Sequence, residues 1–113
     1  MAKLQVALDF VELNKALAMA RQIGKYVDII EAGTPLIKSV GLGCIKELKK
    51  LFPTKMIVAD MKTMDTGYLE TKMAASMGAD AITILAVAPN STIRSAVRCK
   101  DCLLYTSDAA DEL

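Results

Sequence analysis

Short apolar segments alternate with helical patterns four times along this sequence of 113 residues. The apolar segments begin near residues 4, 27, 55 and 81, and between them apolar residues recur at three- and four-residue steps. Such an alternation is typical of parallel strands that are joined by right-handed crossover helices. The repeating unit takes roughly 26 residues, and eight such units would make the ~200 to 250 residues of a closed barrel.

We therefore expect an α/β fold of the (β/α)₈ TIM-barrel kind, of which this chain holds about four units, or half a barrel. A doubly wound open sheet is the alternative architecture. A dinucleotide-binding version of that sheet would carry a glycine-rich turn after its first strand, where LDFVELNK has no glycine. Residues 1–100 are expected to form the half-barrel domain, and residues 101–113 a disordered tail.

Two of the expected helices have features that the sequence defines closely. The third has Leu69, Met73 and Met77 as its apolar stripe, because these residues recur at four-residue steps. The fourth helix is expected to begin with Asn90 or Ser91 as its N-cap, since both side chains can accept a hydrogen bond from the first helical turn.

Composition favours one globular domain and excludes several kinds of partner. Hydrophobic residues make up 53% of the chain and charged residues 24%, and the net charge of +1 offers no basic surface for nucleic acid or an anionic membrane. The chain starts in a strand-like segment without a signal-peptide pattern or a bilayer-spanning run, so we expect a cytoplasmic protein. The three cysteines are expected to be reduced, and the CxxC of Cys99 and Cys102 lacks further ligands for zinc.

Three acidic residues close successive apolar segments: Asp9 follows the first, Glu31 the second and Asp60 the third. Lys62 lies two residues beyond Asp60, so both side chains would leave their strand on the same side. Parallel α/β folds bind ligands at the carboxyl ends of their strands, so these four residues are expected to meet. Facing carboxylates repel, and a hard cation such as Mg²⁺ would neutralise them. The alternative is three polar strand ends that face solvent independently.

Four stretches resemble the 3-hexulose-6-phosphate synthases, members of the orotidine 5′-phosphate decarboxylase suprafamily of barrels. They are LQVALD, VDIIEAGTPLI, ADMKTMDTG and GADAITILA, and the resemblance covers about residues 3–99. The Asp-x-Lys-x-x-Asp signature of Asp60, Lys62 and Asp65 is shared with the orotidine phosphate and 3-keto-L-gulonate 6-phosphate decarboxylases. The Glu-x-Gly-Thr-Pro motif of residues 31–35 and the Lys-Thr-Met-Asp-Thr-Gly segment of residues 62–67 look most like those of the synthases.

The resemblance implies roles for individual residues. Glu31 and Asp60 would bind Mg²⁺, Asp9 and Lys62 would contact substrate hydroxyls, and Asp65 would reach into the active site of the partner subunit in a homodimer. The reaction would be the aldol addition of formaldehyde to the sugar phosphate D-ribulose 5-phosphate, which gives D-arabino-hex-3-ulose 6-phosphate.

Two alternatives stay open, and the tail departs from the family pattern. Decarboxylation of a keto-sugar phosphate or of orotidine phosphate uses the same signature, and a self-associating half-barrel without chemistry is the non-enzymatic alternative. From about Lys100 the segment DCLLYTSDAADEL resembles a translated sequencing adapter joined to a truncated reading frame. Phosphate-binding glycine loops would lie beyond this point, so we expect a poor catalyst whose open edge strands favour self-association.

Overall fold

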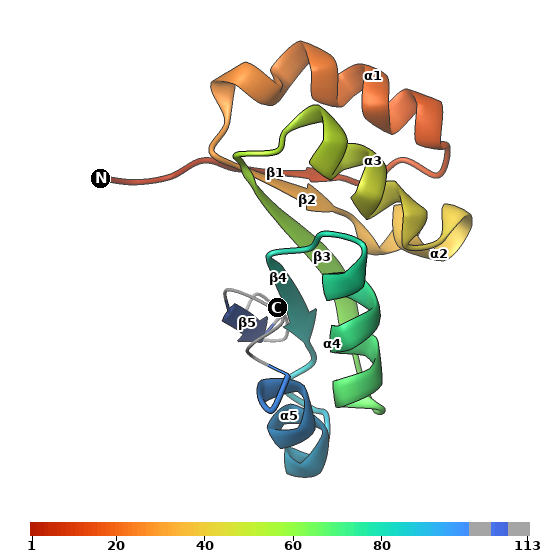
Figure 1. Cartoon of the computed structure of the whole chain (residues 1–113), viewed down its shortest axis with the longest axis vertical. Coiled ribbons are helices and arrows are strands. Elements are labelled where there is room, and N and C mark those ends of the chain that lie inside the picture. The colour runs from red at the N-terminus through yellow and green to blue at the C-terminus, as the bar shows by residue number, and fades with distance from the viewer. Residues whose placement is uncertain (100–104, 109–113) are drawn as a thin grey trace.

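The computed structural model describes residues 1–99 and the backbone of residues 105–108 (Figure 1). Its elements follow in chain order: β1 (Gln5–Leu8), α1 (Leu13–Ile23), the 3₁₀ helix η1 (Gly24–Tyr26), β2 (Ile29–Ala32), α2 (Thr34–Val40), α3 (Gly43–Leu51), β3 (Met56–Thr63), α4 (Gly67–Ser76), β4 (Ala81–Ile84), α5 (Asn90–Val97) and β5 (Tyr105–Asp108). Within these described residues, none of the helices is both long and apolar enough to cross a membrane.

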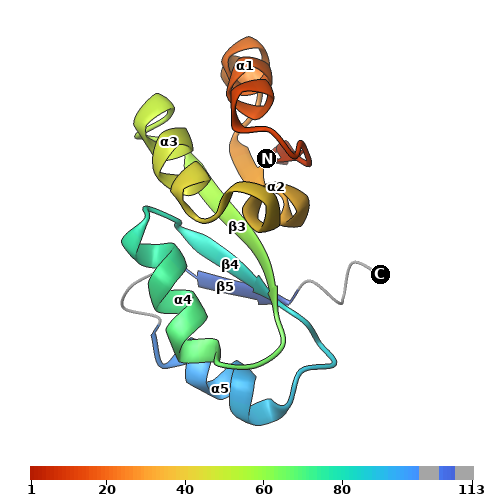
Figure 2. The same ribbon diagram turned by 90° about the vertical axis from the view of Figure 1, so that its right-hand side faces the viewer.

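The strands form one parallel sheet in the order β1-β2-β3-β4-β5. The helices gather along one side of the twisted sheet (Figure 2). A sequential strand order is that of a (β/α)₈ barrel, whereas a doubly wound sheet reverses its order at a switch point. The prediction of half a barrel is therefore confirmed.

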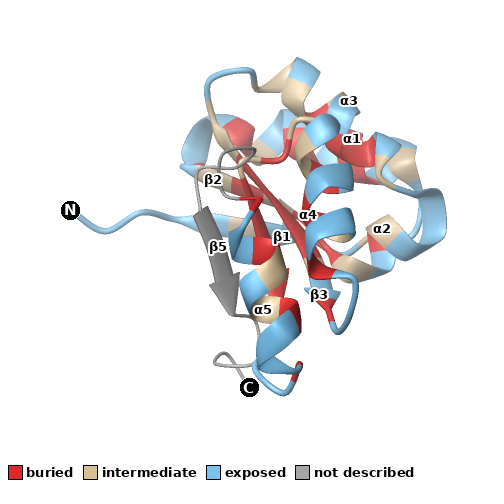
Figure 3. Ribbon diagram, turned by 60° about the horizontal axis from the view of Figure 1, so that its bottom comes forward, coloured by how far each residue is buried: buried red, intermediate tan, exposed pale blue. Residues whose placement is uncertain are grey.

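The core lies between the sheet and the helices. Alternate residues of each strand face the helices because side chains alternate along a strand. The largest buried side chains on this side are aliphatic, from strands and helices alike: Leu8, Ile30, Ile57, Ile82, Leu36, Ile45 and Leu48. Figure 3 shows the buried residues along the strands and on the inner faces of the helices.

Helix α4 packs through small residues and turns its large apolar ones outward. Leu69, Met73 and Met77 are 56%, 45% and 37% exposed. The residues that α4 buries are Gly67, Thr71 and Ala74. A Cβ at Gly67 would lie only 2.2 Å from the backbone oxygen of Thr92 in α5, so the two helices approach too closely for a larger residue. The predicted apolar stripe exists, but it faces away from the core.

Three predicted boundaries are wrong. Glu31 and Asp60 lie within β2 and β3 instead of closing them, because the hydrogen-bonded ladder pairs Glu31 with Val58 and continues past it. Helix α5 has Pro89 as its N-cap, and Asn90 is already helical with no side-chain capping bond. The backbone oxygen of Pro89 accepts the first hydrogen bond instead, from the amide of Thr92.

The expected disordered tail contains a strand. Residues Tyr105–Asp108 form β5, which pairs in parallel with β4 in the register of Ala81 with Tyr105. The prediction of a disordered tail is corrected for these four residues. The edge of β4, which we expected to be open, is paired with β5. Residues 100–104 and 109–113, on which the rest of that prediction falls, lie outside the described part of the chain.

Candidate active site

One pocket brings together four of the five residues that the sequence singles out. Its volume is about 540 Å³, and it lies at the carboxyl ends of β1, β2 and β3. The lining residues are Asp9, Glu31, Thr34, Pro35, Lys38, Asp60 and Lys62. Three acidic and two basic side chains therefore share one concave surface, at the edge where ligands of parallel α/β folds bind.

Strand β3 bulges where it carries the site. Ala59 pairs with Ile82 and Thr63 with Ile84, so β3 has more residues than β4 between these two pairs. Within the bulge Lys62 has a φ of 47°, in the left-handed region that non-glycine residues rarely adopt. Bulges re-aim side chains next to active sites, and such a conformation persists only where surrounding contacts hold it.

Asp60 is almost buried, with 7% of its surface exposed, and both of its carboxylate oxygens are engaged. Oδ1 accepts a hydrogen bond of 2.6 Å from the Thr83 hydroxyl, and Oδ2 accepts one of 2.5 Å from Lys62 Nζ. Burial opposes ionisation and is the largest single influence on this carboxyl. The bonds from Lys62 and Thr83 outweigh it and hold the pKa of Asp60 below its usual value.

The Lys62 ammonium is the electrostatic centre of the pocket. Its hydrogen bond to Asp60 raises its pKa; burial opposes this effect, and the carboxylates of Asp60, Glu31 and Asp9 add to it. Lys62 Nζ also donates to the Thr34 hydroxyl over 3.2 Å. At neutral pH the site therefore holds a fixed positive charge next to carboxylates, which can stabilise an oxyanion that develops on a substrate.

Asp9 and Glu31 are set by their neighbours on β1 and β2. Gly33, the residue after β2, lies so close to Asp9 that a Cβ at position 33 would be 1.9 Å from Asp9 Oδ1. Glu31 Oε1 accepts a hydrogen bond of 2.6 Å from Gln5 Nε2, across the β1–β2 pair. Only a glycine at position 33 leaves room for the Asp9 carboxylate in its present place.

Asp65 is not part of this pocket. It lies exposed in the loop between β3 and α4 and does not line the pocket. The next residue, Thr66, has a φ of 49°, and its hydroxyl contacts the backbone oxygen of Asp65 at 2.8 Å. Two left-handed residues, Lys62 and Thr66, thus lie on either side of Asp65, which is exposed at the surface.

A metal site of three or more protein ligands is not formed by the described residues. The donor set of Glu31 and Asp60 nevertheless suits a hard cation, since both supply carboxylate oxygens and Asp60 favours its ionised form. Mg²⁺ keeps several waters and commonly takes only one or two protein carboxylates. The residues present therefore fit a Mg²⁺ ion whose ligands would be the two carboxylates, waters and substrate oxygens.

Two threonines of the site were missed from the sequence. Thr34 lines the pocket and donates a hydrogen bond of 2.7 Å to the backbone oxygen of Asp60. Thr83 is buried behind the pocket, on β4. One signal was available: Thr83 is the only polar residue in the strand Ala81–Ile84, and an isolated hydroxyl in a buried strand needs a hydrogen-bond partner.

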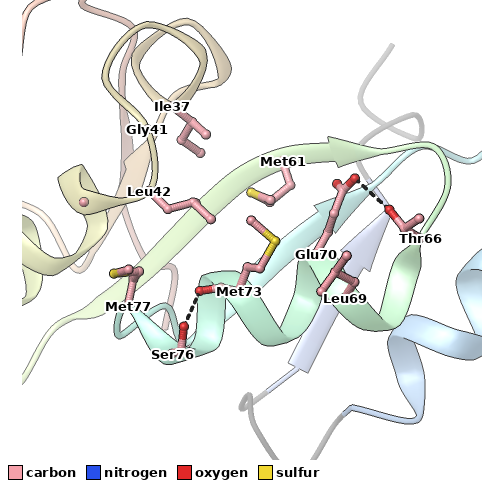
Figure 4. Close-up of a pocket in the computed structure, with 11 residues that line it drawn as sticks. Ile37, Gly41, Leu42, Met61, Thr66, Leu69, Glu70, Met73, Ser76 and Met77 are labelled. Atoms are coloured by element: carbon pink, nitrogen blue, oxygen red, sulfur yellow. Dashed lines mark hydrogen bonds between the residues drawn. The ribbon is translucent and has the colours of Figure 1, made fainter.

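A second pocket, the outer apolar pocket, lies between α4 and the junction of α2 with α3 (Figure 4). Its volume is about 560 Å³. The apolar side chains that line it are Ile37, Leu42, Met61, Leu69, Met73 and Met77. It contains the outward stripe of α4 and none of the charged residues of the candidate active site.

These features define a class of protein: a barrel of alternating strands and helices with acidic residues and a lysine at the carboxyl ends of its strands. The family model described as orotidine 5′-phosphate decarboxylase / HUMPS family matches residues 2–102. The chain belongs to this family.

Similar proteins carry a consistent set of names. The chain is 51% identical over 96 residues to a 3-hexulose-6-phosphate synthase from Mycobacterium gastri. The aligned residues make up 85% of this chain and 46% of that protein. It is 40% identical over 95 residues to the protein of the same name from Bacillus subtilis strain 168, with coverage of 84% and 45%.

Solved structures agree with this family. A crystal structure of 3-hexulose-6-phosphate synthase matches with a TM-score of 0.87 at 50% identity, over 88% of this chain and 48% of that one. A crystal structure of KGPDC from Streptococcus mutans matches with a TM-score of 0.88 at 40% identity, over 90% and 49%. The chain thus spans about half the length of the relatives it matches.

Proposed function

We propose that this chain carries the amino-terminal half of the active site of a 3-hexulose-6-phosphate synthase. The reaction is the aldol addition of formaldehyde to D-ribulose 5-phosphate, which gives D-arabino-hex-3-ulose 6-phosphate. The observation that carries the proposal is the Asp60–Lys62 pair, 2.5 Å apart in a pocket that also holds Glu31 and Asp9. The name shared by relatives at 40% and 51% identity supports this choice of reaction.

The residues of the pocket have separate tasks in this reaction. Lys62 stays protonated because of its carboxylate neighbours, so its ammonium can stabilise the negative charge that develops on the ketose oxygen when a base takes the C1 proton. We expect that base in the half that the relatives have in addition. Asp9 lies at the end of β1, where its carboxylate can accept hydrogen bonds from substrate hydroxyls. Glu31 and Asp60 would hold Mg²⁺, which would supply Lewis-acid polarisation of the ketose oxygens.

Binding of Mg²⁺ is testable without catalysis. A ligand that binds only the folded state stabilises it by mass action, so millimolar Mg²⁺ should raise the melting temperature of the purified chain. The double variant Glu31→Gln with Asp60→Asn should abolish this rise. The matched control removes two exposed carboxylates, that of Glu12 just before α1 and that of Glu47 in α3, with Glu12→Gln and Glu47→Gln, and should keep it. An equal rise in all three proteins would contradict the metal assignment.

Catalysis by this chain alone should be slow. The phosphate of the substrate needs backbone N–H groups of a glycine loop or a helix amino terminus, which we expect in the half that the relatives have in addition. The purified chain with D-ribulose 5-phosphate, formaldehyde and Mg²⁺ should turn over far below the ordinary ~10 s⁻¹ of enzymes. A rate near that value would mean that the site is complete without further strands.

Assays of the purified chain with other substrates separate the alternatives. Release of CO₂ from 3-keto-L-gulonate 6-phosphate or orotidine 5′-phosphate would favour a decarboxylase. The match to the KGPDC structure makes decarboxylation the second candidate reaction. No product with any of these substrates would favour a half-barrel without chemistry. The cytoplasmic location expected from the sequence stays a prediction.

The partner we propose for this family member is a second copy of the chain, docked at the outer apolar pocket. Asp65 lies on the loop that leads into α4, so a copy that covers this pocket could receive that carboxylate. Met73→Lys places a charge in the pocket and should shift sedimentation toward the monomer. Met19→Lys is the matched control on the outer side of α1, where the side chain is also exposed. Identical sedimentation of both variants and the parent would contradict docking at α4.

A further inference from the structure

Two threonine hydroxyls bracket the Asp60–Lys62 pair from neighbouring units of the barrel. Thr83, on β4, donates 2.6 Å to Asp60 Oδ1 and accepts 3.1 Å from the backbone N–H of Lys62. Thr34, the first residue of α2, donates 2.7 Å to the backbone oxygen of Asp60 and accepts 3.2 Å from Lys62 Nζ. Each hydroxyl thus donates a hydrogen bond to Asp60 and accepts one from Lys62.

The bonds of Thr83 fill the gap that the β3 bulge opens. Between the pairs Ala59–Ile82 and Thr63–Ile84 the β3–β4 ladder is irregular, and the N–H of Lys62 bonds to the Thr83 side chain. The left-handed φ of 47° at Lys62 is unfavourable for a non-glycine residue, and neighbouring contacts must offset this. A valine at position 83 would keep the shape of the side chain and remove this contact.

We infer that Thr83 and Thr34 are positioning residues: Thr83 holds Lys62 in its left-handed conformation, and both threonines fix the orientation of the Asp60 carboxylate toward the ligand pocket, Thr34 through its bonds to the Asp60 backbone and the Lys62 ammonium. With Oδ1 tied to β4 and Oδ2 tied to Lys62, the carboxylate cannot rotate without losing a hydrogen bond. Hydrogen-bond partners of a metal-binding carboxylate set its direction and basicity. The effect on Mg²⁺ rests on the proposed function, whereas the effect on Lys62 does not.

The test compares Thr83→Val and Thr34→Val with the serine variants that keep each hydroxyl. Thr71→Val is the matched control, because Thr71 is a buried threonine of α4 whose hydroxyl has no hydrogen-bond partner among the described residues. Two quantities are measured on each full chain. Backbone chemical shifts report the conformation of Lys62 by NMR, and calorimetric titration with Mg²⁺ alone gives the metal affinity.

The expected results separate positioning from plain stabilisation. Both valine variants should lose about 10–100-fold in Mg²⁺ affinity, as is usual when the partner of a ligating side chain is removed. Thr83→Val should also move the Lys62 shifts out of the left-handed range. Both serine variants and Thr71→Val should match the parent in both measurements.

Three outcomes decide the matter. Valine variants that melt earlier but keep the Lys62 shifts and the Mg²⁺ affinity of the parent would overturn the inference, since the threonines would then be structural only. If the parent itself binds no Mg²⁺, the metal assignment fails, and the Lys62 shifts alone decide whether the hydroxyls hold the bulge. If Thr83→Val does not fold, Thr34→Val carries the test from its less buried position, read against Thr34→Ser.

Discussion

Replacing Gly33 with alanine should disturb the candidate active site through sterics alone. Gly33 has φ −67° and ψ 155°, which any residue adopts, so the change introduces no backbone strain. The new Cβ would nevertheless lie 1.9 Å from Asp9 Oδ1 and 2.7 Å from the backbone oxygen of Leu8. Both distances are shorter than real Cβ atoms show, so at least one neighbour must move.

The size of the effect depends on which neighbour can move. The exposed Asp9 carboxylate can swing away, and it must retreat by roughly 1.5 Å to reach ordinary van der Waals contact. The Leu8 oxygen must retreat by roughly 0.7 Å, but Leu8 is 1% exposed and its oxygen accepts the Gly33 amide at 3.0 Å. Overpacking of this kind costs about 1–3 kcal/mol. For a chain of this length the melting temperature should fall by about 4 to 12 °C.

Thermal unfolding followed by circular dichroism measures this change. Gly43→Ala is the control, because Gly43 begins α3 and a Cβ there has no neighbour within 4 Å among the described residues. That variant should be as stable as the parent or gain about 0.4–1 kcal/mol. If Gly33→Ala melts with Gly43→Ala, the close approach of β1 and the start of α2 is not as described, and the reasoning about Asp9 fails with it.

Further predictions concern charge and packing. The pKa of Asp60 is lowered and that of Lys62 raised. The unfolding free energy of the parent should therefore exceed that of the double variant Asp60→Asn with Lys62→Met by an amount that is constant across the neutral pH range. It should shrink as the pH falls below the usual 3.8 of a carboxyl or rises above the usual 10.5 of a lysine, in urea unfolding at each pH. Gly67→Ala should cost about 1–3 kcal/mol, because its Cβ would meet α5 at 2.2 Å; unchanged stability would contradict the close α4–α5 contact. Asp80→Ala should cost about 1–3 kcal/mol, because it leaves the N–H of Ile57 without this acceptor and removes one of the two acceptors of the Lys49 ammonium, which keeps the backbone oxygen of Lys55; a cost no larger than that of Glu47→Ala, in an exposed pair, would refute this.

The order of strands and the meeting of the charged residues could be predicted from the sequence because both depend on a simple periodicity. Apolar runs spaced by one strand–helix unit predict a parallel sheet, and acidic residues that directly follow these runs predict a shared edge. Asp9, Glu31, Asp60 and Lys62 do line one pocket. Their roles toward metal and substrate stay predictions.

The features that escaped the sequence depend on contacts between units. A regular two-residue alternation cannot reveal a bulge, so the left-handed Lys62 and its partner Thr83 were not predicted. The apolar stripe of α4 has a helical period, but its direction depends on Gly67 fitting against Thr92. Periodicity identifies an apolar face without saying whether the core or a different surface covers it.

The bracketed pair also says when the site can form during folding. Its bonds join Thr34 in the second strand–helix unit, Asp60 and Lys62 in the third, and Thr83 in the fourth. A nascent chain that has completed β3 but not β4 already contains Asp60 and Lys62, yet it lacks Thr83, whose hydroxyl accepts the hydrogen bond of the Lys62 amide. The shortest segment able to assemble this pair in its present geometry therefore reaches through β4, and the Lys62 amide is a local reporter of the cooperative docking of three consecutive units.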